Sequence, residues 1–227
     1  MAYIGNSWVL KRLWLITVPA LLLLQTATAD TATEDPKRAL QAKLANLNTF
    51  QGEFIQEVYD GDELIQEGTG YFYLERPAKL RWVTDAPDES TLVADGETLW
   101  YYNPFIEQVT LFRQSEAMQA NPLLLLLDAE QANWDAFSVS YDGKKLWTVE
   151  DSDKAAAGMG SVLHLAFLDA VSDDPAVQDM LYKLILEDGH GQRSVFSLQD
   201  MQKNQPLPAQ AFIFSIPEGT DIDDQRD

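Results

Sequence analysis

Apolar residues recur with a helical period at the start of the regular part of the chain. A helix is expected to begin at Asp35-Pro36, because proline is favoured in the first helical turn, where its missing N–H costs nothing. The apolar stripe of this helix is formed by Leu40, Leu44 and Leu47. The pattern therefore predicts one amphipathic helix that ends near Asn48.

After Asn48 the period of the apolar residues becomes two, which is typical of a strand with one buried face. The residues that share this face are Phe50, Gly52, Phe54 and Val58. Further strands are predicted at about 63–75, 79–84, 90–94, 98–103, 107–113, 136–141, 145–150, 161–169, 180–187, 192–199 and 211–216.

Asp-Gly pairs fall between the predicted strands at Asp60-Gly61, Asp95-Gly96, Asp142-Gly143 and Asp188-Gly189. Asp-Gly suits a tight hairpin turn whose two central residues both have positive φ. Many short strands joined by hairpins predict one large antiparallel sheet that curls on itself.

One segment departs from the strand pattern. Residues 121–130 contain Pro122 and a run of five leucines from Leu123 to Leu127, and we predict a short helix there because leucine is a good helix former. Five consecutive leucines cover every side of a helix, so this helix must be enclosed by other apolar surfaces.

One face of the predicted sheet is strongly apolar around residues 71–108. Phe72 and Leu74 share a face of one strand, Leu80 and Trp82 share a face of the next, and Trp100 and Tyr102 alternate with their neighbours. This spacing is that of an ordinary core. However, a sheet of about eleven strands has a large concave face that two short helices cover only in part. A core and a binding cavity both remain open on these residues.

Arg76 lies where one of these strands turns into the next. Pro77 biases it toward an extended backbone. Its guanidinium has several donors, so it can cap loop or helix carbonyls, or it can simply be a solvated charge.

The first 29 residues have the composition of a secretory signal peptide. The basic pair Lys11-Arg12 precedes an apolar run of 12 residues, 13–24, and Ala27-Thr28-Ala29 is a small-x-small cleavage pattern. The run is too short to span a bilayer comfortably. We therefore expect cleavage after residue 29, which leaves a single domain of 198 residues, 30–227, in the bacterial periplasm.

Charge and residue usage exclude several classes of function. The net charge is −20 and would be −22 without Lys11 and Arg12, which argues against a nucleic-acid binder and fits either a basic partner or adaptation to salt. The chain has no cysteine and two histidines, His164 and His190, so we expect neither disulfides nor a metal site. No nucleophile elbow, phosphate loop or dinucleotide motif is present. We predict no catalytic residue and no cofactor.

Several motifs together resemble one known family. Arg76-Pro77 is followed by Trp82, and residues 92–108 form a long motif that includes Asp95-Gly96 and Asn103-Pro104-Phe105. The start of the first strand (48–56), the leucine run after Asn121-Pro122 and the C-terminal residues 212–226 agree as well. Over residues 30–227 the chain resembles the periplasmic outer-membrane lipoprotein carrier proteins of the LolA type.

This resemblance implies an α+β fold, which is an incomplete, strongly curved antiparallel β-barrel of about 11 strands with a short helical lid over an apolar cavity. Arg76 matches a family arginine that latches the lid to the barrel. Leu80 and Trp82 match cavity positions, Leu80 in place of a family phenylalanine. With the strand pattern, the expected acyl-chain cavity consists of Phe72, Leu74, Leu80, Trp82, Trp100, Tyr102, Leu123, Leu124, Leu126 and Leu127.

The resemblance also implies a function without catalysis. A monomer would take acylated lipoproteins from an inner-membrane lipoprotein-releasing ABC transporter and pass them to an outer-membrane lipoprotein receptor. Two alternatives remain: a periplasmic half-barrel sensor or lipid-binding domain without lipoprotein transfer, and a hydrolase with paired carboxylates among the 36 acidic residues.

Overall fold

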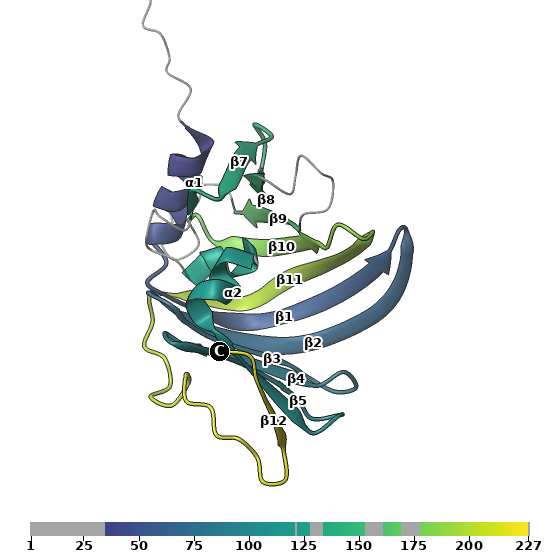
Figure 1. Ribbon diagram of the computed structural model, residues 1–227. Helices are drawn as coiled ribbons and strands as arrows, with labels where there is room; N and C mark the ends of the chain where they lie inside the picture. The colour runs from purple at the N-terminus through teal and green to yellow at the C-terminus, as the bar shows by residue number, and fades with distance from the viewer. Residues whose placement is uncertain (1–34, 121, 128–133, 153–160, 169–177, 227) are drawn as a thin grey trace, which may run out of the picture. The chain divides into compact units, whose positions relative to one another are not determined.

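In the described part of the chain, one strongly curved sheet of twelve strands dominates the structure (Figure 1). The computed structural model describes residues 35–120, 122–127, 134–152, 161–168 and 178–226. The chain divides into two units, Met1–Thr33 and Glu34–Asp227, and all of these residues belong to the second. The predicted signal peptide lies outside the described residues.

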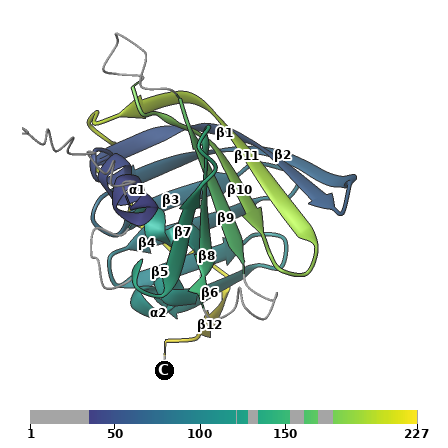
Figure 2. The ribbon, with the colours of Figure 1, turned by 90° about the horizontal axis from the view of Figure 1, so that it is seen from above.

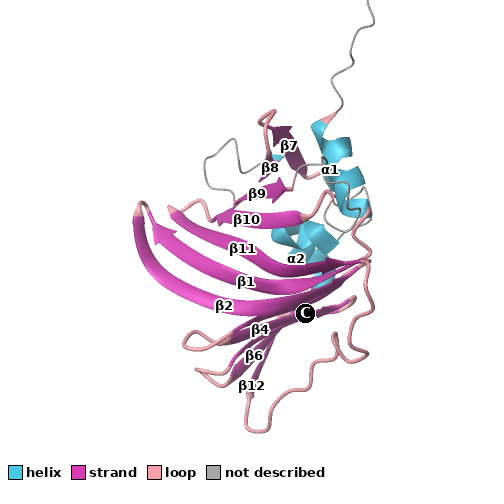
Figure 3. Cartoon of the chain, turned by 180° about the vertical axis from the view of Figure 1, so that it is seen from behind, coloured by secondary structure: helices cyan, strands magenta, loops and turns pink. Residues whose placement is uncertain are grey.

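The sheet is built almost entirely from antiparallel neighbours, as predicted. Its order is β12-β6-β5-β4-β3-β2-β1-β11-β10-β9-β8-β7. The strands are β1 Thr49–Asp60, β2 Glu63–Glu75, β3 Lys79–Thr84, β4 Ser90–Asp95, β5 Thr98–Asn103, β6 Gln108–Arg113, β7 Phe137–Tyr141, β8 Leu146–Asp151, β9 Val162–Phe167, β10 Leu181–Glu187, β11 Gln192–Lys203 and β12 Asp221–Asp224. The long strands β1, β2 and β11 form its strongly bent middle (Figure 3).

All four Asp-Gly pairs lie at the turns of hairpins, which confirms that prediction. The φ angles differ from the expected ones, because in each pair only the glycine has positive φ. In three of the pairs the aspartate side chain instead accepts backbone N–H groups of its own turn. Asp142 Oδ1, for example, accepts from the N–H of Lys144 (2.8 Å) and Lys145 (2.9 Å). These turns are therefore stabilised by side-chain capping.

Helix α1 (Pro36–Ala45) forms where the pattern predicted a helix. Asp35 caps it by accepting from the Lys37 N–H (3.1 Å), and Pro36 occupies its first turn. Leu40, Leu44 and also Leu47, which lies just beyond the helix, are buried.

The leucine run forms a 3₁₀ helix, η1 (Pro122–Leu127), which we call the leucine helix. Helix α2 (Gln114–Ala120), which the pattern did not predict, comes directly before it. Both lie on the connection that takes the chain from β6 to the opposite edge of the sheet at β7.

The helical segments lie where the barrel is incomplete. Helix α1 packs on β7, α2 packs on β5 and β6, and the leucine helix contacts α2, β8 and β9. The sheet curls around its inner face with the helices near one end of the strands (Figure 2). The main core forms on this face, between the sheet, α1 and the leucine helix. Among the described residues, no helix has the length and hydropathy needed to cross a membrane.

The prediction of a strand at 211–216 is wrong. This segment crosses the outer face of the sheet without pairing as a strand, and its backbone carbonyls are bonded by one side chain. Arg81 donates from Nε to Ala211 O and from Nη2 to Ile213 O (2.7 Å). The chain then forms β12, which pairs with β6 in parallel.

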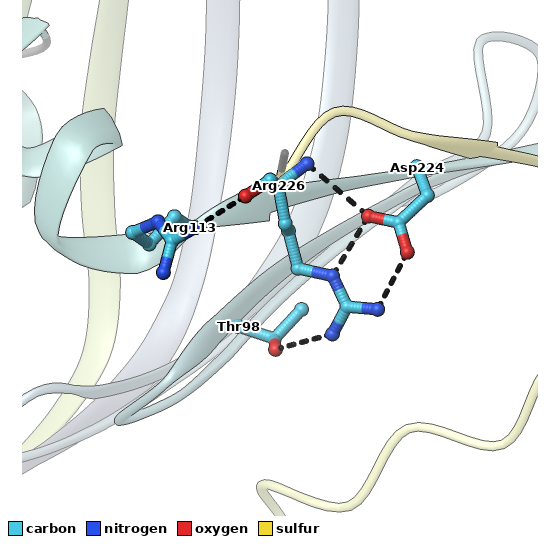
Figure 4. A network of polar contacts seen from close by, with 4 residues as sticks. All are labelled: Thr98, Arg113, Asp224 and Arg226. Carbon is cyan, nitrogen blue, oxygen red and sulfur yellow. Dashed lines mark hydrogen bonds and ion pairs between the residues drawn. The ribbon is translucent and has the colours of Figure 1, made fainter.

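A network of polar contacts fixes the end of the described chain (Figure 4). The Arg226 guanidinium donates to Asp224 Oδ2 (2.6 Å) and to Thr98 Oγ1 (3.2 Å), and Arg113 donates to the Arg226 carbonyl. Bonds from the Arg226 side chain and N–H lower the pKa of the Asp224 carboxyl despite a smaller opposing effect of burial. This network links β12 to β5 and β6.

Candidate functional site

An apolar cavity lies between the inner face of the sheet and the helical segments. Its volume is about 20 Å³, which is space for about one water molecule. Strands β1, β2, β3, β10 and β11 form one wall, while α1 with its following turn and the leucine helix form the other. The lining side chains are Leu44, Leu47, Phe50, Phe72, Leu74, Leu80, Trp82, Leu126, Leu127, Leu181, Leu184 and Leu198.

The cavity ends at a layer of four aromatic rings. Trp82 stacks on Phe54 with ring centroids 4.3 Å apart and on Phe72 at 5.5 Å. Phe196 meets Trp82 edge-on at 5.2 Å. Offset and edge-to-face pairs of this kind each stabilise a structure by about 0.5–1.5 kcal/mol beyond their buried area.

Gly70 is what allows this layer to form. A Cβ at this position would lie 2.4 Å from Phe54 Cζ and 2.0 Å from the Val83 carbonyl oxygen. The Phe54 ring lies across β2 at this residue, so any side chain would push it away from Trp82. At Gly68 the nearest atom to such a Cβ is 3.7 Å away, which leaves room for a methyl group.

The leucine helix is bonded to the turn between β2 and β3 at two points. Arg76 Nη2 donates to Leu126 O (2.6 Å), and the Ala78 N–H donates to Leu127 O (3.1 Å). These carbonyls end the helix, whose last turn would otherwise leave them without partners inside it. The structure thus brings together Arg76 and the leucine run, which are 50 positions apart in sequence.

A buried glutamine fastens the other end of the helical connection to the same turn. Gln114 begins α2 and is 1 % exposed. Its Nε2 donates to Ala78 O (2.6 Å), and its Oε1 accepts from the Gly96 N–H (2.9 Å). Its own N–H donates to Glu97 O (3.0 Å). Gln114 therefore ties α2 to two hairpin turns, and Ala78 bonds both ends of the α2–η1 connection.

Asp95 holds the second of these hairpin turns. Its Oδ1 accepts from the N–H of Glu97 (2.9 Å) and Thr98 (2.8 Å), and its Oδ2 accepts from Trp100 Nε1 (3.1 Å). Burial raises the pKa of the Asp95 carboxyl, but these hydrogen bonds outweigh burial and leave that pKa below its ordinary value. The ionised carboxylate is thus part of the structure that positions Gly96 against Gln114.

Sequence comparison shows which family of proteins this chain matches. Residues 45–215 match the model of the outer membrane lipoprotein carrier protein LolA. An outer-membrane lipoprotein carrier protein of Idiomarina loihiensis is 34% identical over 193 residues, which cover 85% of this chain and 89% of that protein. One from Vibrio vulnificus is 33% identical over 86% of this chain and 93% of its own.

The chain belongs to the outer-membrane lipoprotein carrier family.

Solved structures agree on the fold. A putative outer membrane lipoprotein-sorting protein domain from Vibrio parahaemolyticus matches with a TM-score of 0.50, although only 12% of the residues are identical. The match covers 79% of this chain and 96% of that domain. The predicted incomplete antiparallel barrel is therefore confirmed, with twelve strands among the described residues in place of about eleven.

The structure of this lipoprotein-carrier family member gathers six of the predicted cavity residues around one space. These are Phe72, Leu74, Leu80, Trp82, Leu126 and Leu127. Leu124 is buried in the same core but does not line the cavity. The side chain of Leu123 lies outside the described residues.

The placement of Trp100 and Tyr102 at the cavity is wrong. Trp100 pairs with Val93, which pairs with Arg81, so its side chain shares the outer face of the sheet. Both rings pack there on Phe214, with centroids 5.7 Å and 6.0 Å away. The reason is that the C-terminal segment of this carrier-family chain covers part of the outer face, so both sides of β5 carry apolar residues.

Sequence reasoning missed the other half of the cavity wall in this carrier-family chain. The residues concerned are Leu44, Leu47, Phe50, Leu181, Leu184 and Leu198. The apolar stripe of α1 marked two of them as buried, but only the pairing of β1 with β11 brings β10 and β11 to this space. Gln114 gave no signal, because a single glutamine after a strand is unremarkable in sequence. In the described part of the chain, no group of three acidic or histidine side chains is arranged to hold a metal ion.

Proposed function

We propose that this chain is a periplasmic carrier that binds the acyl chains of lipoproteins released from the inner membrane and delivers them to a receptor at the outer membrane. The observation that carries the proposal is an apolar cavity covered by a short helix that one turn holds through a few hydrogen bonds. The names of the relatives support the same function.

The described arrangement is a closed form. A space of about 20 Å³ cannot hold an acyl chain. Cargo can enter only if the wall formed by Leu126 and Leu127, or that formed by α1, moves away from the sheet. The apolar side chains that fill the closed form would then contact the acyl chains.

The free energy needed to open the closed cavity limits the affinity of the carrier for its cargo. Burial of one methylene is worth about 0.8 kcal/mol, so three fully enclosed acyl chains would contribute on the order of 30 kcal/mol. This exceeds the strongest known non-covalent affinities, about 21 kcal/mol, and such a carrier would not release its cargo. Separation of the leucine helix from the sheet opposes binding and keeps release possible.

In this proposal Arg76 is the latch of the leucine helix. Its bond to Leu126 O involves a charged donor, a type that contributes about 1.5–3 kcal/mol. Loading of cargo breaks the bond, and its re-formation in the emptied carrier favours unloading.

The remaining parts of the proposal follow the family pattern. Residues 1–29 act as the signal peptide, and residues 30–227 act as one monomeric domain without cofactor or catalytic residue. An inner-membrane lipoprotein-releasing ABC transporter loads the carrier, and an outer-membrane lipoprotein receptor unloads it.

The direct test is to isolate the protein from its native periplasm and to identify bound lipoprotein by mass spectrometry. The purified protein is then titrated with a fluorescent fatty acid. We expect bound lipoprotein and saturable uptake. Uptake without transfer to a receptor would indicate a lipid-binding domain, and no uptake would mean that the apolar face is only a packing core.

A further inference from the structure

Two helical walls face the sheet across the cavity. Helix α1 and its following turn contribute Leu44 and Leu47, and the leucine helix contributes Leu126 and Leu127. All four side chains are buried, so apolar burial does not show which wall moves to admit cargo. The two walls differ in the polar contacts that fasten each of them to the rest of the molecule.

Helix α1 is fastened near each end by a lysine side chain. Near its start, Lys37 Nζ donates to the Trp134 carbonyl oxygen (3.0 Å), just before β7. Near its end, Lys43 Nζ forms a hydrogen-bonded ion pair with Asp179 Oδ1, just before β10, and lies over the ring of Phe167 on β9. These contacts tie α1 to the half of the sheet that contains β7, β9 and β10.

Asn204, which follows β11, fixes the turn that joins α1 to β1. Its Nδ2 donates to Asn46 O (2.9 Å), and its Oδ1 accepts from the Asn48 N–H (2.9 Å). Its own N–H donates to Thr49 O (2.8 Å). Only residues 46–48 separate α1 from β1, so α1 could swing away from the sheet only about this turn. Because the turn is bonded at both of its ends, it resists that rotation.

The backbone of Asn204 supports this role of its side chain. Its φ is 57°, in the left-handed region that favours glycine and that asparagine adopts more readily than most other residues. The asparagine amide has both a donor and an acceptor, whereas glycine has neither and an aspartate can only accept. The position thus combines a conformation open to few residues with a side chain that bonds both ends of the turn.

The leucine helix is held to the sheet in a simpler way. Its described bonds to the sheet come from one turn, through Arg76 Nη2 to Leu126 O and the Ala78 N–H to Leu127 O. Movement away from this single turn breaks both bonds. By contrast, α1 can move only if its bonds to three separate segments, before β7, before β10 and after β11, all break.

We propose that α1 is a fixed wall of the cavity, that Asn204 positions it, and that cargo enters only by displacement of the leucine helix. The inference rests on the proposed carrier function, because it concerns how that cavity opens. A fixed α1 keeps part of the apolar lining in place while the leucine helix moves. The acyl chains then meet a preformed surface, which lowers the ordering cost of binding.

Cross-linking tests whether α1 must move. The chain has no cysteine, so an introduced pair has no competing thiols. Ala45 and Gln178 are exposed and line the same open pocket of about 370 Å³. In Ala45→Cys/Gln178→Cys, a flexible bismaleimide that spans this pocket would lock α1. Affinity for the fluorescent fatty acid should stay within about twofold of that before cross-linking, because locking a wall that does not move leaves the binding equilibrium unchanged.

Asn204→Gly tests the positioning role, since glycine keeps the left-handed backbone and removes the amide bonds. Hydrogen exchange at the Asn48 N–H should become faster. Fatty-acid affinity should fall about fivefold, the effect of roughly one hydrogen bond. Affinity is measured where every variant is fully folded, so a role in stability alone would leave it unchanged. The cross-link between positions 45 and 178 should restore the affinity.

Two further variants serve as controls. Asp200→Gly lies on the same strand, replaces an exposed side chain at a similar φ of 47°, and should change neither exchange at Asn48 nor affinity. Asn204→Asp keeps the acceptor for the Asn48 N–H but loses the donor to Asn46 O, so its affinity should lie between those of wild type and Asn204→Gly. It also covers the case that Asn204→Gly does not fold.

Three results would overturn the inference. They are a larger loss of affinity on cross-linking, an unchanged affinity in the folded Asn204 variants, and a tighter binding by these variants, which would make α1 the wall that opens. If the wild type takes up no fatty acid, the carrier function itself fails, which is a different outcome from failure of the fixed wall.

Discussion

Arg76 donates a hydrogen bond to the carbonyl oxygen of Leu126 (2.6 Å), so the turn after β2 holds the end of the leucine helix against the sheet. Two residues later Ala78 bonds Leu127 through its N–H and Gln114 through its carbonyl. The turn 76–78 therefore contacts both ends of the α2–η1 connection. Movement of the leucine helix away from the sheet, which would open the cavity, has to break hydrogen bonds to this one turn.

Arg76→Leu should still accept lipoprotein but should pass it on poorly. Removal of the guanidinium weakens the closed form by about 1.5–3 kcal/mol, so the emptied state gains less on closing. Transfer from loaded carrier to purified receptor measures the effect. Arg76→Lys, which keeps the charge but lacks the planar fork, should lie between the variant and the wild type. Normal transfer by Arg76→Leu would disprove the latch.

Gln114→Leu should loosen the fixed end of the same connection. It leaves the Ala78 carbonyl and the Gly96 N–H without their side-chain partner, and we expect a loss of about 1–3 kcal/mol in the free energy of unfolding. Hydrogen exchange should become faster at Gly96. The neighbouring, exposed Ser115→Ala is the control and should change neither quantity. Unchanged exchange at Gly96 would argue against this role of Gln114.

Substitutions of Trp82 and Trp100 should distinguish the inner face of the sheet, which borders the cavity, from its outer face. Trp82→Ala removes a cavity wall and should lower fatty-acid uptake severalfold, since its large apolar surface is lost. Trp100→Ala acts on the outer face, where the ring contacts Phe214, and uptake should be unaffected. Both variants are titrated with the same fluorescent fatty acid, under conditions in which the same fraction of each variant is folded. A similar loss in both would contradict the strand register.

Gly70→Ala should disrupt the aromatic layer, whereas Gly68→Ala should be tolerated. The added methyl would collide with Phe54 at the first position and has room at the second. Overpacking of this kind typically costs about 1–3 kcal/mol, occasionally more. Urea unfolding measures the stability, and a change in the near-ultraviolet circular dichroism relative to wild type, to which the stacked Trp82 contributes, reports on the aromatic layer. Equal stability of the two variants would contradict the predicted packing.

Acid should remove the stabilisation that Asp95 provides. Its pKa is lower in the folded than in the unfolded protein, so the unfolded state takes up the proton more readily. This contribution to stability is fully present at neutral pH. It decreases as the pH falls below about 4, the ordinary pKa of an aspartate, and it is lost once the pH has passed through the lower pKa that Asp95 has in the folded protein. The difference in free energy of unfolding between wild type and Asp95→Asn should therefore narrow from pH 7 to about pH 3. The exposed Asp62→Asn controls for net charge, and a gap that is constant with pH would contradict the prediction.

Much of the fold follows from local patterns. Asp35-Pro36 begins α1 because a cap and a proline act within one turn of the chain. The alternation of Phe50, Phe54 and Val58 indicates the buried face of β1, since successive strand side chains point to opposite faces. The hairpins at the Asp-Gly pairs are equally local.

Only part of the candidate site can be predicted from local sequence patterns. Arg76, Trp82 and the leucine run stand out in the sequence, and the structure brings them together. Nothing local marks Leu181 or Leu184 as lining the same cavity, because β10 reaches it only through the pairing of β11 with β1. Local sequence does not reveal the role of Gln114 either, since its partners Ala78 and Gly96 come from two other turns.

The sequence by itself determined the helix α1, the strands β1 to β11, the hairpins and a strongly apolar face around Trp82. The tertiary structure alone decided which of two apolar faces borders the cavity. On β5, Leu99 and Trp100 both look like core residues, and the C-terminal segment makes both sides apolar by packing Phe214 on the outer one. The same segment reads as a strand at 211–216, yet Arg81 bonds its carbonyls in place of a neighbouring strand. The physical reason is that alternation specifies two faces of a strand, whereas contacts between distant segments specify what each face meets.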